Sequence, residues 1–225
     1  MDITYLKRLE KLDTSDISEA IDRELRIMSG DNKSRYSTIL AYILYRASKD
    51  NIKDVDSIEL FESSCDVDSS IKIELDYYCH DIWPVLDRLK IYGFDEDNLL
   101  AYLLFNNDLE DSLREASTPR GILKLAAKIL DVQENESVLE LCSGKGNFFV
   151  ELALLRENIK YTGIELSMAN NFIANIRASV LERDISLFLS DAMTYKAKNQ
   201  ADKLFANYPF LINVPDMENI VKDME

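Results

Sequence analysis

The first half of the chain has a helical pattern of apolar positions. From residue 1 to about residue 115, apolar residues recur at three- and four-residue spacing, and strict alternation is rare. This pattern predicts a helical bundle forming an N-terminal domain over residues 1–115. The expected helices cover residues 15–29, 36–48, 70–83, 85–92 and 97–105, with stops at Gly30, Pro84 and Gly93.

The pattern changes after Ser117, where apolar runs of strand length begin to alternate with amphipathic segments of helix length. Strands are expected at residues 137–142, 161–165, 185–189 and 203–206, and helices at 118–130, 146–157 and 167–182. Pro119 suits the first turn of the first of these helices, with Ser117 or Thr118 as its cap. The succession predicts an α/β fold with a Rossmann-like parallel sheet in a second domain over residues 116–225.

The composition indicates the cellular compartment and whether a structural metal or disulfide bonds are to be expected. Cys65, Cys79 and Cys142 have neither the number nor the spacing of a disulfide scaffold or a zinc site, so reduced thiols and no structural metal are expected. No apolar run reaches the roughly 18 residues of a membrane helix, and the charged N-terminus lacks the apolar centre of a signal peptide. We therefore expect a cytoplasmic protein without a membrane partner.

The net charge of −15 is concentrated in the first half. Residues 1–115 hold 26 acidic and 14 basic side chains, whereas residues 116–225 hold 15 and 12. Binding to nucleic acid relies on Lys and Arg that neutralise phosphates, so an acidic module is poorly suited to grip DNA alone. If DNA is the substrate, another component must supply most of the positive surface. The alternative is that the acidic face serves solubility.

A glycine pair indicates a cofactor site. Gly144-Lys145-Gly146 follows a buried strand and opens a helix, which lets a ligand approach backbone amides, although a tight turn alone would also use glycine. Glu165 lies 21 residues after Gly144 at the end of the next strand, where it can accept hydrogen bonds from ribose hydroxyls. Together they predict an adenosine-containing cofactor.

The cofactor is expected to lack phosphates. Asn147-Phe148 replaces the x-x-Gly of dinucleotide binders, and no phosphate-binding loop is present. S-adenosylmethionine fits, with Glu140 near its cationic amino-acid end and Asp191 receiving the adenine amino group. The alternative for Asp191 is to cap a helix or turn.

The order of these motifs resembles that of the adenine-N6 DNA methyltransferases, specifically the modification subunit of type I restriction-modification systems and its relatives. The matching positions are Thr118-Pro119, residues 140–146, Glu165, Asp191 and Asn207-Tyr208-Pro209-Phe210. Leu141 and Ser143 replace a proline and a cysteine of the family's loop, and Tyr208 replaces the first proline of its Asn-Pro-Pro-aromatic motif. The resemblance covers about residues 115–212, and a helical N-terminal domain of similar size is usual in the family.

The resemblance implies methyl transfer from S-adenosylmethionine to adenine in double-stranded DNA, with a specificity subunit or other restriction-modification subunits as partners. The expected catalytic motif comprises Asn207, Tyr208, Pro209 and Phe210. Asn207 and the carbonyl of Tyr208 would accept hydrogen bonds from the amine, and Phe210 would stack on the flipped base. The expected cofactor-binding positions are Thr118, Pro119, Glu140, Cys142, Gly144, Gly146, Phe148, Glu165, Leu166, Asp191 and Ala192.

Two other functions remain open. Protein-glutamine methyltransferases also combine a helical N-terminal domain with an Asn-Pro-Pro-Tyr motif, although the Thr-Pro segment and Phe210 favour DNA. A non-catalytic cofactor-binding or interaction module is the other reading, because Tyr208 restores a backbone N–H and frees φ. Fifteen residues follow Phe210, so we expect only the first half of a class I methyltransferase sheet in this chain.

Overall fold

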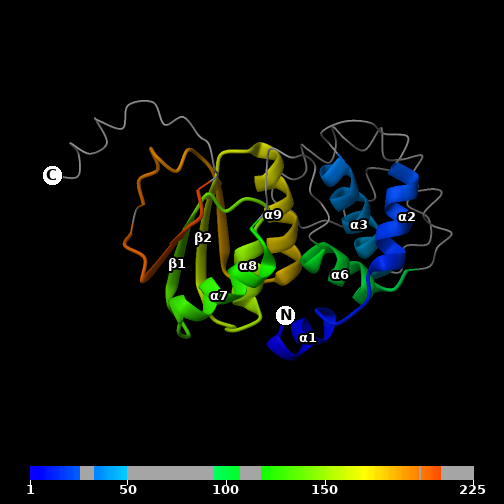
Figure 1. Ribbon diagram of the computed structural model, residues 1–225, viewed down its shortest axis with the longest axis horizontal. Coiled ribbons are helices and arrows are strands. Elements are labelled where there is room, and N and C mark those ends of the chain that lie inside the picture. Colours follow the sequence, from blue (N-terminus) through cyan, green and yellow to red (C-terminus); the bar gives the residue numbers. More distant parts are fainter. Residues whose placement is uncertain (26–32, 50–93, 107–117, 198, 209–225) are drawn as a thin grey trace.

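The computed structural model describes residues 1–25, 33–49, 94–106, 118–197 and 199–208 (Figure 1). The helices expected at 70–83 and 85–92, the stops at Gly30, Pro84 and Gly93, and Cys65, Cys79, Ser117, Pro209 and Phe210 lie outside these residues. The described helices are α1 Ile3–Leu9, α2 Ser15–Leu25, α3 Lys33–Lys49, α6 Glu96–Phe105, α7 Arg120–Leu130, α8 Asn147–Ala153 and α9 Met168–Leu181. The described strands are β1 Ser137–Leu141, β2 Lys160–Glu165, β3 Ile185–Leu189 and β4 Lys203–Ala206.

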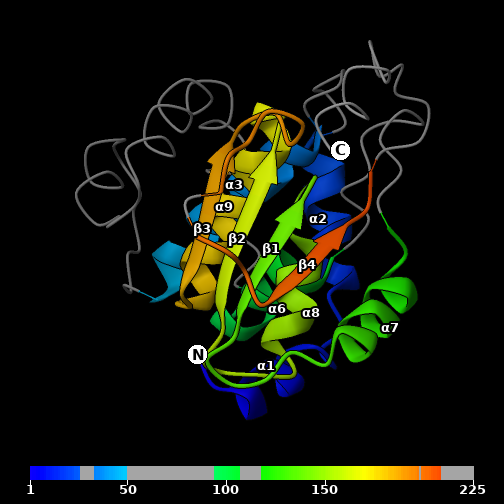
Figure 2. The ribbon, with the colours of Figure 1, turned by 90° about the vertical axis from the view of Figure 1, so that its left-hand side faces the viewer.

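The four described strands form one parallel sheet in the order β3-β2-β1-β4 (Figure 2). In the register, Leu139 of β1 lies opposite Thr162 of β2 on one side and Leu204 of β4 on the other. Parallel strands all end at the same edge of a sheet, so the segments that follow β1, β2, β3 and β4 meet there. The predicted α/β, Rossmann-like architecture is confirmed.

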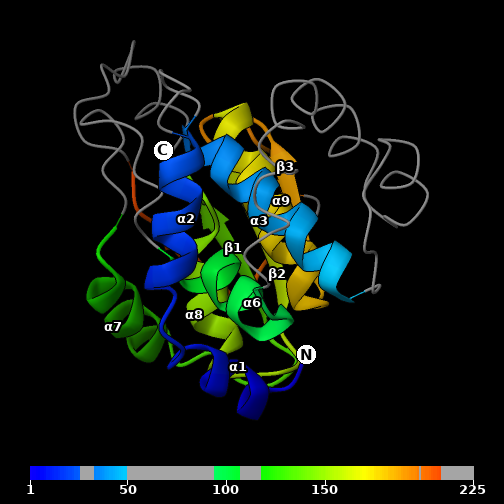
Figure 3. The ribbon, with the colours of Figure 1, turned by 90° about the vertical axis from the view of Figure 1, so that its right-hand side faces the viewer.

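Helices α8 and α9 cover one face of the sheet, and the N-terminal helices pack against their outer side (Figures 1 and 3). One continuous apolar core runs from Leu6 of α1 through Leu100 of α6 to Ile173 of α9. The opposite face of the sheet exposes Phe188 and Leu204 in the described part of the chain. The division into two domains near residue 115 stays a prediction.

Helix α6 shows how the sequence places an element at the centre of this arrangement. Asp95 caps it by accepting a hydrogen bond from the Asn98 backbone N–H at 2.8 Å, and Glu96 and Asp97 favour the positive end of the helix dipole. The residues from Leu99 to Leu104 are all buried. A helix that is apolar all round belongs in a core, and α6 accordingly lies between α3 and the helices on the sheet.

Several predicted boundaries are wrong; helix α3, for example, begins at Lys33 rather than at residue 36, and three further differences lie near the site. Helix α7 begins at Arg120 rather than at Thr118, and Pro119 is its N-cap instead of a first-turn residue. No side-chain hydrogen bond caps α7, because proline at the N-cap has no side-chain acceptor, and the Thr118 hydroxyl accepts from Asn207 instead. Strand β1 ends at Leu141, since Cys142 has a left-handed φ of 62°. Helix α8 ends at Ala153, because the chain tightens into a turn in which Leu155 N donates to Leu152 O.

None of the helices in the described ranges combines the length and apolarity needed to cross a bilayer.

Candidate functional site

The glycine loop, residues 142–146, leaves the carboxyl end of β1 in a tight, left-handed turn. Cys142, Gly144 and Gly146 have φ values of 62°, 56° and 80°. Ser143 N donates to Ile164 O at 2.9 Å, which extends the pairing between β1 and β2 past the end of the strand, and Gly146 N donates to Ser143 O at 3.0 Å. Left-handed backbone costs a non-glycine residue about 1–2 kcal/mol, so Cys142 holds its conformation only because the surrounding loop imposes it.

The two glycines of the loop serve different purposes. A Cβ on Gly146 would overlap the ring of Phe149, so this glycine is required by core packing as well as by its φ. A Cβ on Gly144 would meet no atom within 4 Å. The space beside Gly144 is open, as expected for a backbone that a ligand approaches, whereas Gly146 supports the tight-turn interpretation.

Glu165 braces the glycine loop from the end of β2. Its Oε2 accepts a hydrogen bond from Gly144 N at 2.7 Å, and its Oε1 accepts one from Ser167 N at 2.7 Å. The carboxylate therefore joins the segment after β1 to the segment after β2. Each oxygen keeps a further lone pair for a ligand hydroxyl. The ribose-binding role stays a prediction, with the side chain at the place that role requires.

Glu140 lies beneath the loop, on the helix-covered face of β1. Its side chain is only 3% exposed, and it accepts a hydrogen bond from the Tyr161 hydroxyl. Burial raises the pKa of Glu140 well above its ordinary value, and nearby Glu165 adds to this, while the bond from Tyr161 opposes it. The carboxyl faces Tyr161 instead of the open side of the loop, and its expected contact with the cofactor stays a prediction.

Asp191 begins the turn that follows β3. Its Oδ1 accepts from Met193 N at 2.9 Å, and its backbone oxygen accepts from Thr194 N and Tyr195 N at 3.1 and 2.9 Å. Asp191 thus caps a turn, which is the alternative left open by the sequence. Within the described ranges its Oδ2 accepts no hydrogen bond, so one carboxylate oxygen stays available to a ligand.

Asn207 follows β4 and contacts the start of α7. Its Nδ2 donates a hydrogen bond to Thr118 Oγ1 across 89 positions of sequence. Its Oδ1 accepts no hydrogen bond from any group that the structure describes. Tyr208, the next residue, is 48% exposed. The carboxamide oxygen of Asn207 is therefore an open acceptor at the same sheet edge as Glu165 and Asp191.

The remaining predicted cofactor positions differ in what they can offer. Phe148 is buried and stacks on Phe205 with ring centroids 4.1 Å apart, so its side chain belongs to the core. Leu166, next to Glu165, is 69% exposed. Ala192 and Cys142 are half-buried, and burial raises the pKa of the Cys142 thiol.

Sequence reasoning missed the side chains that hold this edge together. Arg120 donates to Glu151 and Glu10 and lies over the Phe105 ring, which secures Thr118-Pro119. Gly163 sits in the middle of β2, where a Cβ would come within 3.0 Å of the Ser143 hydroxyl. A glycine inside a buried strand is a known sign of close backbone approach, so this position carried a readable signal.

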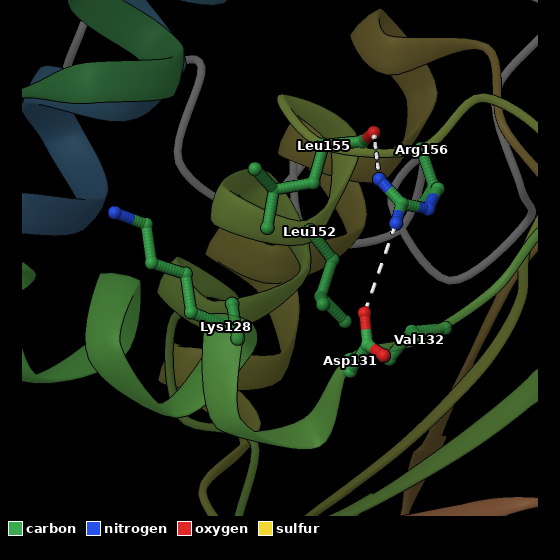
Figure 4. Close-up of a pocket in the computed structure, with 7 residues that line it drawn as sticks. Lys128, Asp131, Val132, Leu152, Leu155 and Arg156 are labelled. Atoms are coloured by element: carbon green, nitrogen blue, oxygen red, sulfur yellow. Dashed lines mark hydrogen bonds and ion pairs between the residues drawn. The ribbon is translucent and has the colours of Figure 1, made fainter.

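The cavities found among the described residues lie away from the candidate site. A cavity of about 150 Å³ between α7 and α8 is lined by Lys128, Leu152 and Leu155, with Asp131 and Arg156 paired at 3.9 Å beside it (Figure 4). Helix α7 ends here and the chain then leads into the start of β1, so this cavity is at the opposite edge of the sheet from Asn207 and Glu165. It is not part of the candidate site.

The sequence pattern of the family described as N-6 DNA methylase matches residues 102–225, which is more than half of the chain. The chain belongs to the N-6 DNA methylase family. All the site positions named above fall inside the matched range.

A solved structure with a TM-score above 0.5 supports the fold. A chain described as a class I S-adenosylmethionine-dependent methyltransferase from Listeria monocytogenes is 15% identical, with 93% of this chain and 62% of that one covered and a TM-score of 0.55. A chain described as a modification subunit of a type I restriction enzyme from Vibrio vulnificus is 22% identical, with 56% of this chain and 32% of that one covered and a TM-score of 0.43. A methyltransferase from Thiobacillus denitrificans in complex with S-adenosyl-L-homocysteine is 26% identical, with 42% of this chain and 39% of that one covered and a TM-score of 0.37.

This chain therefore spans less than two thirds of the length of these solved methyltransferases. No curated protein matches it.

The two glycines of the loop predict unequal losses of stability. Gly146→Ala should lower the free energy of unfolding by about 2–4 kcal/mol, because left-handed strain adds to overlap with Phe149. Gly144→Ala, which meets no neighbouring atom, should cost only about 1 kcal/mol from its φ. Urea unfolding followed by circular dichroism measures both, and equal losses would contradict the distinction.

Burial of Glu140 predicts a stability that falls as the pH rises. A carboxyl whose pKa is higher in the folded protein stabilises that protein fully at pH values below the unfolded pKa of 4.5. This stabilisation is lost as the pH rises through the folded pKa. Glu140→Gln imitates the protonated form and should flatten this decline above about pH 4.5. Urea midpoints across that range provide the measurement, and parallel profiles for the variant and the unaltered protein would refute the assignment.

Proposed function

We propose that this chain supplies the cofactor site and the amine-binding loop of an adenine-N6 DNA methyltransferase, which transfers a methyl group from S-adenosylmethionine to adenine in double-stranded DNA. The observation that carries the proposal is the hydrogen bond from Asn207 Nδ2 to Thr118 Oγ1. It brings two separate family motifs together at the sheet edge where Glu165 and Asp191 also lie, and it leaves the Asn207 oxygen free to accept from an amine.

The residues at the sheet edge fit S-adenosylmethionine. Open space beside Gly144 admits a ligand to the loop, and Glu165 offers carboxylate oxygens to ribose hydroxyls. Asp191 Oδ2 suits the adenine amino group, and exposed Leu166 offers an apolar surface for a ring. The bound cofactor would supply an electrophilic methyl group on its sulfonium.

Asn207 and the Tyr208 carbonyl would activate the target amine. The lone pair of an exocyclic adenine nitrogen is delocalised into the ring, which makes the nitrogen a poor nucleophile. Two hydrogen bonds, one to Asn207 Oδ1 and one to the next carbonyl, favour a more tetrahedral nitrogen. Thr118 contributes by holding Nδ2, so that the carboxamide oxygen stays the group presented to the amine. Positioning of this kind can supply several kcal/mol of the barrier.

DNA binding is proposed to depend on partner subunits. The chain carries a net charge of −15, so the phosphates of a duplex would be repelled by much of its surface. A specificity subunit, or another subunit of a cytoplasmic restriction-modification complex, would supply the basic groups and the choice of sequence.

Cofactor binding tests the first half of the proposal. The purified chain should bind S-adenosylmethionine in a calorimetric titration, and Glu165→Gln should weaken the affinity by about tenfold or more, because two backbone donors and the ribose lose a carboxylate. Glu182→Gln is the matched control, since Glu182 is exposed beyond the other end of the described sheet. Absence of binding by the unaltered chain would overturn the proposal.

Methyl transfer tests the second half. With radiolabelled S-adenosylmethionine, adenine-containing duplex DNA and the partner subunits present, Asn207→Ala should lower kcat by about a hundredfold or more while leaving cofactor affinity nearly unchanged. Thr118→Val should lower kcat by about tenfold, and Thr118→Ser should restore it, because serine keeps the accepting hydroxyl. Transfer to a glutamine-containing peptide instead of DNA would identify the protein-directed alternative, and cofactor binding without transfer would identify the non-catalytic one.

A further inference from the structure

We propose that Arg177 is a positioning residue that holds the glycine loop in its ligand-binding shape and ties that loop to the end of helix α6. Its function in cofactor binding rests on the function proposed above. Arg177 lies on α9, beneath the loop, and is only 1% exposed. It is among the largest fully buried side chains in the described residues.

The guanidinium of Arg177 donates to two separate segments. Its Nε donates to Leu103 O at 2.8 Å and its Nη2 to Asn106 O at 3.1 Å, both at the carboxyl end of α6. Its Nη1 donates to Lys145 O at 3.0 Å and to the side-chain oxygen of Asn147. One side chain therefore bridges the last turn of an N-terminal helix and the residues on either side of Gly146.

Physical chemistry explains why a guanidinium suits this place. Burying a charge is costly unless every donor finds an acceptor, and the flat fork of an arginine reaches several carbonyls at once. Carbonyls at the end of a helix have few partners within the helix and lie at the negative end of its dipole, which favours a cation there. Burial lowers the pKa of Arg177 to about 10, so the side chain stays charged at neutral pH.

The bond to Lys145 O matters because of the residues on either side. Gly144 and Gly146 are both left-handed, and a backbone with two such glycines has many accessible conformations. Fixing the carbonyl between them selects one conformation. The opposite side of the loop is fixed by Glu165, which accepts from Gly144 N. The loop is thus held between a buried cation below and a carboxylate at the sheet edge.

The same contacts make the loop depend on the N-terminal half of the chain. Leu103 and Asn106 belong to the predicted helical domain, whereas Lys145 and Asn147 belong to the predicted methyltransferase domain. A change at the end of α6 would reach the cofactor loop through Arg177. The N-terminal helices accordingly support the site as well as the core.

The test compares Arg177→Met and Arg177→Lys with Asn175→Ala. Methionine keeps the length and removes every donor, and lysine keeps the charge and part of the hydrogen bonding. Among the described residues, the side chain of Asn175 bonds only to Asn171 O, within α9. Backbone amide exchange is measured without cofactor over residues 143–147, and S-adenosylmethionine affinity is measured by calorimetry. In Arg177→Met, loop exchange should rise and affinity should fall, each by about tenfold or more. Lysine should give intermediate values, and Asn175→Ala should match the unaltered protein.

The outcomes separate this inference from the proposed function. A folded Arg177→Met protein with unchanged loop exchange and unchanged affinity would overturn the role of Arg177. If the unaltered chain fails to bind S-adenosylmethionine, the proposed function fails, and the exchange data alone decide whether Arg177 holds the loop. If Arg177→Met does not fold, Arg177→Lys still loses part of the hydrogen bonding to Lys145 O and the end of α6, and an unchanged exchange pattern in that variant would refute the inference.

Discussion

The parallel pairing of β1 with β2 on one side and β4 on the other is the constraint on which the rest of the site depends. Because three neighbouring strands run in the same direction, the glycine loop, Glu165 and Asn207 emerge at one edge although they span more than sixty positions of sequence. Pairing β1 with β4 also brings Asn207 next to Thr118. An antiparallel β4 would send Asn207 to the opposite edge, away from the glycine loop and from Glu165.

Buried ionisable side chains hold this edge from below. Glu140, Glu151 and Arg177 are all buried, and each bonds to a partner from another element: Tyr161, Arg120, and the end of α6. A buried charge that loses its partner costs more than the pair contributes, so such contacts specify one arrangement more than they stabilise it. The site is therefore built on a polar framework inside an apolar core, with the N-terminal helices as part of that framework.

The candidate site was predictable wherever a role depends on the end of a strand. Glycine after β1, an acidic side chain at the end of β2 and another after β3 follow from the predicted strand ends, and the Asn after β4 from the resemblance to the family motif; each lies at the expected edge. The direction in which a side chain points was harder to predict from the sequence. Glu140 and Phe148 lie next to the loop in sequence, yet both side chains enter the core, because alternation along β1 and the inner face of α8 point them there.

The sequence by itself determined the spans of β3 and β4 and the position of α9, for which Ser167 serves as the cap and Glu182 ends the helix in a left-handed conformation. These features depend on residues within a few positions of each other, and apolar periodicity and capping chemistry act at that range. Only the tertiary structure decided the order of the strands, the partner of the Thr118 hydroxyl and the four acceptors of Arg177. The side-chain contacts of Thr118 and Arg177 join residues 30 to 89 positions apart, and the path of the chain, which no local pattern encodes, brings them together.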